Sequence, residues 1–238
     1  MKKLTMALVA IALVLCMAQA VMAKGEVGLK LGYDFKTRYY DEPGEEYDKT
    51  NSFLIGLSGN YYVYDGFSLA AKASLALGKY EFFGQGEGLA DSTQVNVHLF
   101  ARYNVLELDA FSLGVQVGGI YEYYSKAYLS IGVEWSHNLF FIAPGLYLNY
   151  DISQKINVYG DFKFPVYYNI SGDFSNAGFF KVLFYDITVG GAYKITPNIY
   201  LGLEAVVSNS TAYKLEALEW ESIYKVEFSI GIKAGYKF

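Results

Sequence analysis

Cysteine, histidine and proline are scarce in this 238-residue sequence, which contains one Cys, two His and four Pro. A single cysteine, Cys16, excludes an internal disulfide. Two histidines and one cysteine do not supply the His/Cys clusters that bind zinc, and no GxxxxGK[ST] nucleotide loop occurs. We therefore expect no metal site, no cofactor and no cofactor-binding residues.

An excess of positive charge is also missing, because the formal net charge is -5 at pH 7. A protein that neutralises phosphates needs clustered Lys and Arg, so nucleic acid is disfavoured as a partner. Carboxylates instead gather in one predicted link, at Asp41, Glu42, Glu45, Glu46 and Asp48. A solvated charge run explains them best, and bound divalent cations are the alternative.

Only one long apolar run is present, Leu4 to Met17, and it lies at the N-terminus. Lys2 and Lys3 precede it, and the small-residue sequence ending at Ala23 follows, which is the pattern of a cleaved secretory signal peptide. Bulky Leu15 before Cys16 disfavours lipidation. We expect a signal peptide over 1–23 and one domain over 24–238, without a second apolar run long enough for a transmembrane helix.

The apolar residues of the remaining chain recur with period two, which indicates β-strands with two unlike faces. In the first segment Leu29, Leu31 and Tyr33 alternate with Lys30, Gly32 and Asp34. Ten segments follow this rule, the later ones centred on Ala143, Asp161, Thr188, Gly202 and Ile230.

The links between these segments alternate between short and long. Short ones occur at 64–66, 106–109, 151–154 and 196–198, and long ones near 37–51, 81–93, 125–138, 168–178 and 209–221. Four short and five long links suit an all-β, antiparallel, up-and-down barrel of about ten strands with both ends on the short-turn side. A soluble barrel or sandwich is the alternative, and the length of the segments, about nine to eleven residues, favours a barrel that crosses a membrane.

The C-terminal Phe228, Ile230, Ile232, Ala234, Tyr236 and Phe238 alternate with small and polar residues. Together with the signal peptide and the ten segments, this ending resembles the small bacterial outer-membrane barrels, the OmpA/OmpX-like group. The resemblance implies a Gram-negative outer-membrane location reached through the periplasm, with Tyr236 and Phe238 read as a signal by the barrel-assembly machinery. Outer-membrane lipid and lipopolysaccharide are the implied partners; the oligomeric state stays open.

Barrel closure follows from the cost of unpaired backbone groups in hydrocarbon. Residues 25–36 are therefore expected to pair with residues 224–238. Tyrosines near the segment ends are expected to form two interfacial girdles: Tyr33, Tyr61, Tyr103, Tyr121, Tyr150, Tyr193, Tyr224 and Tyr236. Lys181 is expected on the lipid side near the outer rim.

Charged residues near the segment centres predict a polar lumen with two unlike walls. The basic wall carries Lys30, Lys72, Arg102 and Lys233, and the acidic wall carries Asp161, Asp186 and Glu204. Lys163 and Glu227 lie among charges of opposite sign and are expected to pair locally. Buried charges need partners, so a salt-bridge network filling a narrow lumen is favoured over a pore with a transverse field.

Two features complicate this prediction. Pro144 and Pro165 lie inside adjacent predicted strands and lack the backbone N–H that a ladder needs, so we expect a bulge or irregularity there. The alternating run 127–133 competes with the sixth segment. If this run were embedded in the membrane, the strand count would change.

Catalysis is weakly supported. His98 is predicted deep in the lumen as a hydrogen-bonding structural residue, whereas His137, with Ser136 and Glu134, lies near the outer rim where lipid A-modifying enzymes work. Adjacent strand residues point to opposite faces, which separates Ser136 from His137. The sequence thus predicts a non-enzymatic envelope protein with a structural or surface-interaction role and no catalytic residues. The alternatives are a small porin-like diffusion channel and a lipid A-modifying rim enzyme.

Overall fold

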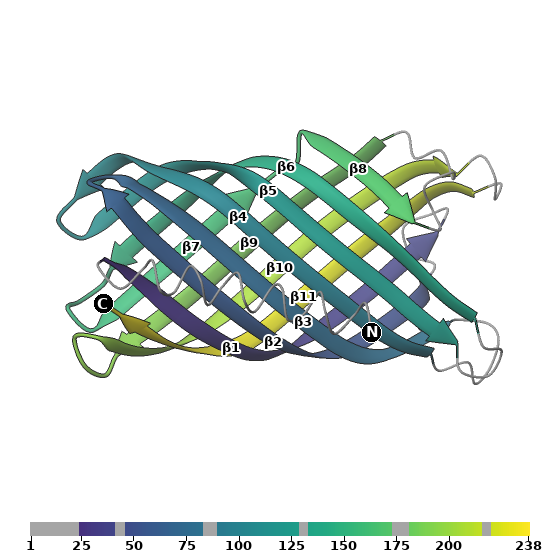
Figure 1. Ribbon diagram of the computed structural model, residues 1–238, viewed down its shortest axis with the longest axis horizontal. Helices are drawn as coiled ribbons and strands as arrows, with labels where there is room; N and C mark the ends of the chain where they lie inside the picture. The colour runs from purple at the N-terminus through teal and green to yellow at the C-terminus, as the bar shows by residue number, and fades with distance from the viewer. Residues whose placement is uncertain (1–23, 41–45, 83–89, 129–132, 173–180, 216–219) are drawn as a thin grey trace.

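The computed structural model describes residues 24–40, 46–82, 90–128, 133–172, 181–215 and 220–238. The predicted signal peptide, 1–23, lies outside these residues. The strands are β1 (Gly25–Tyr40), β2 (Glu46–Tyr64), β3 (Phe67–Phe82), β4 (Ala90–Leu108), β5 (Phe111–Tyr128), β6 (Val133–Asp151), β7 (Ile156–Lys163), β8 (Tyr167–Gly172), β9 (Lys181–Lys194), β10 (Ile199–Leu215) and β11 (Trp220–Lys237) (Figure 1). Within these ranges no helix is long and apolar enough to cross a membrane.

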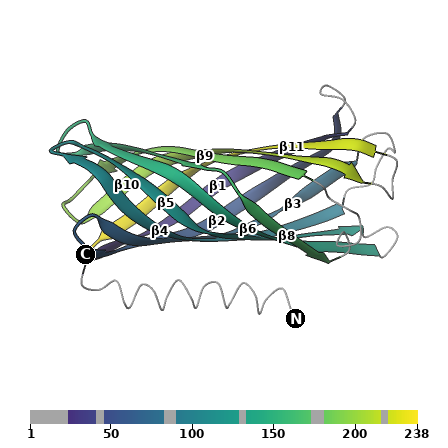
Figure 2. The same cartoon turned by 90° about the horizontal axis from the view of Figure 1, so that it is seen from above.

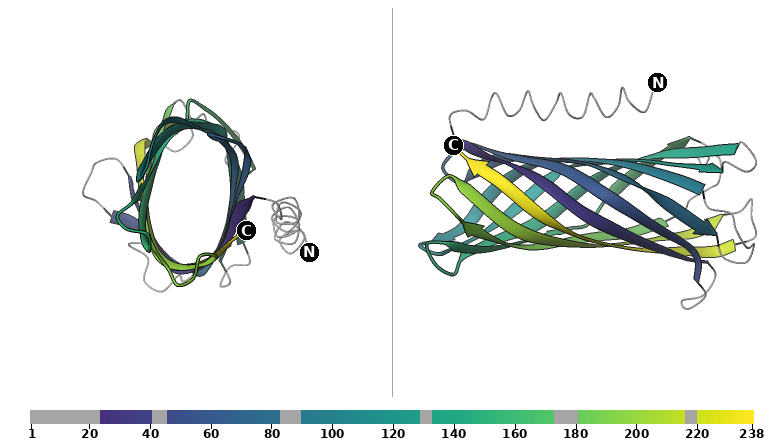
Figure 3. Two further views of the ribbon diagram at one scale, coloured as in Figure 1. Left: turned by 90° about the vertical axis from the view of Figure 1, so that its left-hand side faces the viewer. Right: turned by 90° about the horizontal axis from the view of Figure 1, so that it is seen from below.

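The strands form one closed antiparallel sheet. Neighbours follow chain order from β1 to β6, β7 and β8 both pair with β6, and β1 pairs with β11 from Glu26–Lys237 to Tyr40–Ile223. Viewed along its axis, the sheet is an oval ring (Figure 3). Because β7 and β8 lie end to end along β6, they make one crossing, and the fold is the predicted ten-stranded up-and-down barrel.

Short turns close one end of the barrel, where β1 begins and β11 ends (Figure 2). At the opposite end the strands run much further than the sequence predicts. Thr37–Tyr40 still belongs to β1. Of the run 127–133, the described residues Ala127, Tyr128 and Val133 lie at the ends of β5 and β6 and add no separate strand. A 19-residue strand such as β2 spans about 60 Å along its length, well beyond an apolar band of about 25 Å.

The predicted alternation of faces is confirmed. On β1 the side chains of Leu29, Leu31, Tyr33 and Phe35 are more than 40% exposed, whereas Asp34 and Lys36 are at most 5% exposed. Large apolar side chains cover the outside of every strand whose side chains are described, and most buried polar groups point into the barrel. The molecule is therefore apolar outside and largely polar inside, the reverse of a soluble barrel.

A bulge lies between β7 and β8, at Pro165 and beside Pro144 of β6. Between the pairs Gly145–Lys163 and Ile142–Tyr167, β6 advances by three residues (145 to 142) while the opposite strand advances by four (163 to 167). The extra residue falls in Phe164-Pro165-Val166, which separates β7 from β8. Phe164 and Val166 still donate backbone hydrogen bonds to Pro144 and Ile142, so pairing with β6 continues through the bulge. Pro144 itself causes no register shift against β5.

Because the bulge holds one surplus residue, deletion of Pro165 leaves every flanking pair in register, and we expect this variant to assemble normally. Deletion of Ala205, in the regular centre of β10, reverses the faces of the strand on one side of the deletion. Either Leu203 turns inward and Glu204 outward, or Val206 turns outward and Val207 inward. This second variant should fail to assemble. Heat-dependent gel mobility after refolding in detergent measures both, and equal loss of the folded band would contradict the surplus-residue assignment.

Candidate functional site

The candidate site is a layer of charged side chains that spans the lumen. Arg102 donates to Asp161 at 2.7 Å, and Lys72 lies 3.6 Å from Asp161 and 3.9 Å from Glu204. Lys30 donates to Glu204 at 3.1 Å. Asp161 is on β7 while Lys72 and Arg102 are on β3 and β4, so these contacts join opposite sides of the barrel rather than neighbouring strands.

Beyond this layer, toward the long-link end, charges pair with their neighbours. Lys163 donates to Asp186 at 2.8 Å across β7 and β9, and Lys36 lies 3.3 Å from Glu227 and 3.1 Å from Asp34. Sequence reasoning did not include Lys36 and Asp34 in the network. Their positions in the alternation of β1 place both on the lumen side, which is the signal that could have identified them.

Lys233 differs from the other basic residues of the layer. Its Nζ lies 5.5 Å from the ring centroid of Tyr159 and 5.7 Å from that of Tyr200. Among the described residues, no carboxylate forms an ion pair with it. The structure thus brings eight of the nine predicted lumen charges into ion pairs and leaves Lys233 between two aromatic rings.

Tyrosines stand over glycines on the lumen wall near the short turns. Tyr147 faces Gly114, Tyr159 faces Gly190 and Tyr200 faces Gly235 across neighbouring strands. A Cβ at these glycines would lie 2.4, 2.3 and 2.1 Å from ring atoms, so each ring occupies the space that only glycine leaves free. Tyr159 also donates to Glu204 at 2.9 Å, which ties the wall to the charged layer.

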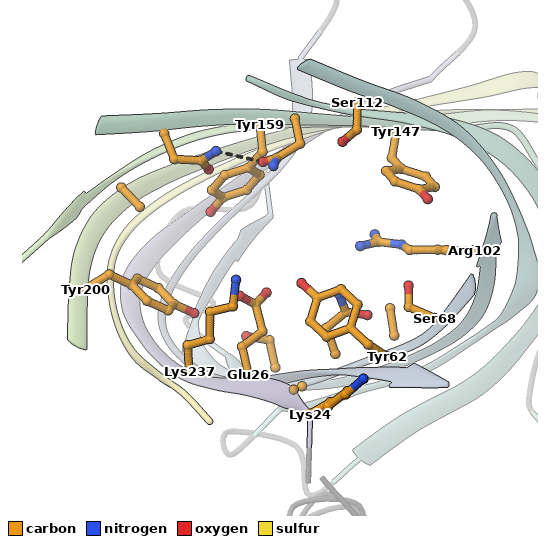
Figure 4. A pocket seen from close by; sticks show the side chains of 18 of the residues that line it. Lys24, Glu26, Tyr62, Ser68, Arg102, Ser112, Tyr147, Tyr159, Tyr200 and Lys237 are labelled. Carbon is orange, nitrogen blue, oxygen red and sulfur yellow. Dashed lines mark hydrogen bonds between the residues drawn. The ribbon is translucent and has the colours of Figure 1, made fainter. Parts of the chain in front are cut away.

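These residues surround a cavity of about 820 Å³ that we call the vestibule. It lies at the short-turn end, where Tyr62, Tyr147, Tyr159 and Tyr200 surround it and Arg102 points inward (Figure 4). A second cavity, of about 90 Å³, lies deeper in the lumen. Lys72, Glu204 and Lys233 line both cavities, so the charged layer is the partition between them.

One part of the lumen wall is apolar, and sequence reasoning missed it. Phe100, Ile120, Phe141 and Ala143 form a cluster at most 5% exposed, together with Ala70 and Leu139. Phe100 lies between His98 and Arg102 in the alternation of β4, which places it inside the barrel. The Nζ of Lys163 lies 5.6 Å from the Phe100 ring centroid, so charged and apolar groups pack together across the lumen.

The histidines form no catalytic arrangement in the described part of the chain. Ser136 and His137 occupy successive positions of β6, opposite Ser125 and Tyr124, and therefore point to opposite faces as predicted. His98 faces the smaller cavity, and its Nδ1 has no hydrogen-bond partner, so the predicted hydrogen-bonding role is wrong at that atom. Among the described residues, no group of three His, Cys, Asp or Glu could hold a metal ion.

The predicted assembly residues lie on the outer surface at the short-turn end. Tyr236 and Phe238 are 42% and 41% exposed, with ring centroids 5.0 Å apart. Their role as a signal stays a prediction. The side chains of Lys181, Glu134 and Tyr224 and those of the acidic link (Asp41, Glu42, Glu45, Glu46 and Asp48) lie outside the described residues.

Comparison with solved structures finds the same architecture. The outer membrane protease OmpT from Escherichia coli superposes with a TM-score of 0.53 and 14% identity, over 91% of this chain and 97% of that one. The translocator domain of the autotransporter NalP from Neisseria meningitidis gives 0.50 and 13%, over 98% of each chain. No family model matches the chain, and no curated protein matches its sequence. The fold is therefore that of outer-membrane β-barrels.

The charged layer predicts a stability difference between two acidic residues. Asp161→Asn removes a carboxylate, 6% exposed, that serves both Arg102 and Lys72, and we expect a loss of about 3 kcal/mol because buried cations lose their partner. Asp91→Asn, in the exposed pair with Lys79, should cost less than about 1 kcal/mol. Urea unfolding from lipid vesicles measures both, and equal costs would contradict a supporting role for the layer.

Proposed function

We propose that this protein is an integral component of the bacterial outer membrane, exported with a cleaved signal peptide, and that its barrel serves envelope structure or surface interaction. The exposed belt supports the membrane location. Large apolar side chains cover the outside of the barrel, and five tyrosines gather on that face near the short turns: Tyr61, Tyr103, Tyr150, Tyr193 and Tyr236. Aromatic girdles at this level are typical of membrane interfaces.

The lumen supports a non-conducting role. Toward the long-link end, the inward side chains of Lys36, Glu122, Tyr124 and Lys126 are all less than 10% exposed. The smaller cavity, about 90 Å³, has room for only a few waters. Side chains therefore fill the lumen between the vestibule and the far half of the barrel, and this filling is the observation on which the proposal rests.

A structural or surface-interaction role also fits the lack of a catalytic arrangement among the described residues. Of the two solved structures compared above, OmpT is a protease, so the fold itself is compatible with catalysis. The separation of Ser136 from His137 on β6 gives the rim-enzyme alternative no support. Outer-membrane lipid and lipopolysaccharide against the apolar belt, and the barrel-assembly machinery during insertion, remain the proposed partners.

A small diffusion channel is the second candidate, and one observation favours it. The two cavities are separated by a single layer, and Lys72, whose side chain is 29% exposed, is held only by contacts of 3.6 and 3.9 Å. Movement of this side chain would loosen the layer between the cavities. The packed far half must also open before a solute could cross.

The membrane location predicts different costs at two equally exposed leucines. Leu203 is 61% exposed and lies inside β10, whereas Leu108 is 60% exposed and lies at the short-turn end of β4. In lipid vesicles we expect Leu203→Arg to cost roughly 2–4 kcal/mol and Leu108→Arg at most about 1 kcal/mol, since a charge is most costly near the bilayer midplane. Urea unfolding measures this difference. A soluble barrel would tolerate both substitutions.

The filled lumen predicts that the protein inserted into planar bilayers gives no discrete conductance steps. Single-channel recording in moderate salt, which screens the ion pairs little, tests this. Discrete steps from the unmodified protein would contradict the proposal. If the size of these steps changes in Lys72→Gln but not in the matched surface variant Lys79→Gln, the channel alternative is established.

A further inference from the structure

We infer that the vestibule is a binding site for a small oxyanion, a phosphate or carboxylate, with the ammonium group of Lys233 as its anchor. This inference does not depend on whether the lumen conducts. It rests on the direction in which Lys233 points, on the charge balance of the layer and on the donors left without an acceptor.

The glycines opposite Lys30 and Lys233 set the directions of these two side chains. The two lysines face each other directly across the β1–β11 seam, where like charges repel. A Cβ at Gly231 would lie 2.7 Å from Cε of Lys30, and a Cβ at Gly28 would lie 2.7 Å from Cε of Lys233. Each lysine therefore crosses a glycine of the opposite strand.

These crossings run in opposite directions along the barrel. Gly231 lies on the long-link side of the pair, opposite Glu204, so Lys30 turns that way and reaches the carboxylate at 3.1 Å. Gly28 lies on the short-turn side, opposite Gly235, so Lys233 turns toward the vestibule. The seam thus separates the two charges and directs one of them into the cavity.

The charge balance at the vestibule floor favours an anion. Four cations, Lys30, Lys72, Arg102 and Lys233, share the two carboxylates of Asp161 and Glu204. The layer therefore carries an excess of two positive charges, where low-dielectric walls strengthen electrostatic attraction. The rim lowers this excess to one, because Glu26, Asp65, Glu107 and Asp151 there outnumber Lys24, Lys194 and Lys237. At this rim Lys194 pairs with Asp151 at 3.6 Å.

Two hydrogen-bond donors converge on this excess charge. The Tyr200 ring lies over Gly235 and its hydroxyl oxygen approaches Gly28, the same glycine that Lys233 crosses. Within the described ranges, neither the Tyr200 hydroxyl nor the Lys233 ammonium donates to a protein acceptor, whereas the hydroxyl of neighbouring Tyr159 donates to Glu204. An oxyanion at this point would accept from both donors, and charge-assisted bonds of this kind are among the strongest available.

The alternative occupants suit the floor less well. A cation would add to its positive excess, and a neutral sugar would gain from the tyrosine rings but would leave the Lys233 charge without a counterion. The cavity, about 820 Å³, is within the size range of small-molecule sites. It lies at the short-turn end, which faces the periplasm in outer-membrane barrels, so the ligand would arrive from that side.

Isothermal titration of the full mature chain in neutral detergent tests the inference, with inorganic phosphate, succinate, glucose and methylammonium as probes at equal ionic strength. We expect saturable binding of phosphate or succinate and none of the other two. The preferred anion distinguishes a phosphorus oxyanion from a carboxylate. Binding of glucose or methylammonium, or no anion binding, would overturn the inference.

Two lysine variants assign the anchor. Lys233→Gln should weaken anion binding roughly tenfold or more, because it removes a charge-assisted bond, whereas Lys194→Gln, at a vestibule lysine already paired, should change affinity by less than about twofold. Lys233→Arg keeps the charge and should retain binding, which separates anchoring from folding if the Gln variant assembles poorly. Unchanged affinity in Lys233→Gln, or equal losses in both Gln variants, would contradict the assignment.

Discussion

The requirement that every backbone polar group find a partner controls this structure. Hydrocarbon offers no alternative partner, and each unpaired group there would cost several kcal/mol. β1 and β11 meet this requirement by pairing without a break from Glu26–Lys237 to Tyr40–Ile223. Once the sheet is closed, alternate side chains must point into one narrow space, and the composition of the lumen follows from that geometry.

Side chains are arranged differently in two regions of the lumen, and the residues on neighbouring strands determine each arrangement. Near the short turns, glycines opposite Tyr147, Tyr159 and Tyr200 let the rings lie flat on the wall, so the space in the middle stays open. In the centre, charged side chains from opposite walls meet and close the lumen. The same β1–β11 seam contributes to both regions, because Gly28 and Gly231 send its two lysines to different sides of the layer.

Much of the fold could be predicted from the sequence because strand alternation is a local signal. Strand number, antiparallel order, closure and the two faces all follow from it. The strand ends do not, since alternation continues past the membrane into Thr37–Tyr40 and into the ends of β5 and β6. Alternation therefore identifies a strand without showing where lipid ends, and the links were predicted too long.

The site was less predictable because it depends on how far along the barrel axis each side chain lies and on the stagger between neighbouring strands. The sequence places Lys30 and Lys233 on one face, but only the register between β1 and β11 shows that they oppose each other. Likewise, Asp161 and Arg102 belong to distant segments, and their 2.7 Å contact depends on the tilt of both strands. The apolar cluster was missed for a different reason: Phe100 breaks the rule that lumen-facing residues are polar, a rule that fails wherever the lumen is packed rather than wet.

This packing makes the two ends of the lumen physically different. Charges buried on the long-link side, such as Lys163 and Asp186, are paired, as their loss of hydration demands. Lys233 can remain without a carboxylate partner because it borders a cavity large enough to admit water or a ligand. Within the part of the chain that the structure describes, the charge without a carboxylate partner thus lies on the vestibule side of the layer. The packed far half, on which the proposal of a non-conducting lumen rests, and the cavity that we infer to bind an anion therefore follow from the same asymmetry.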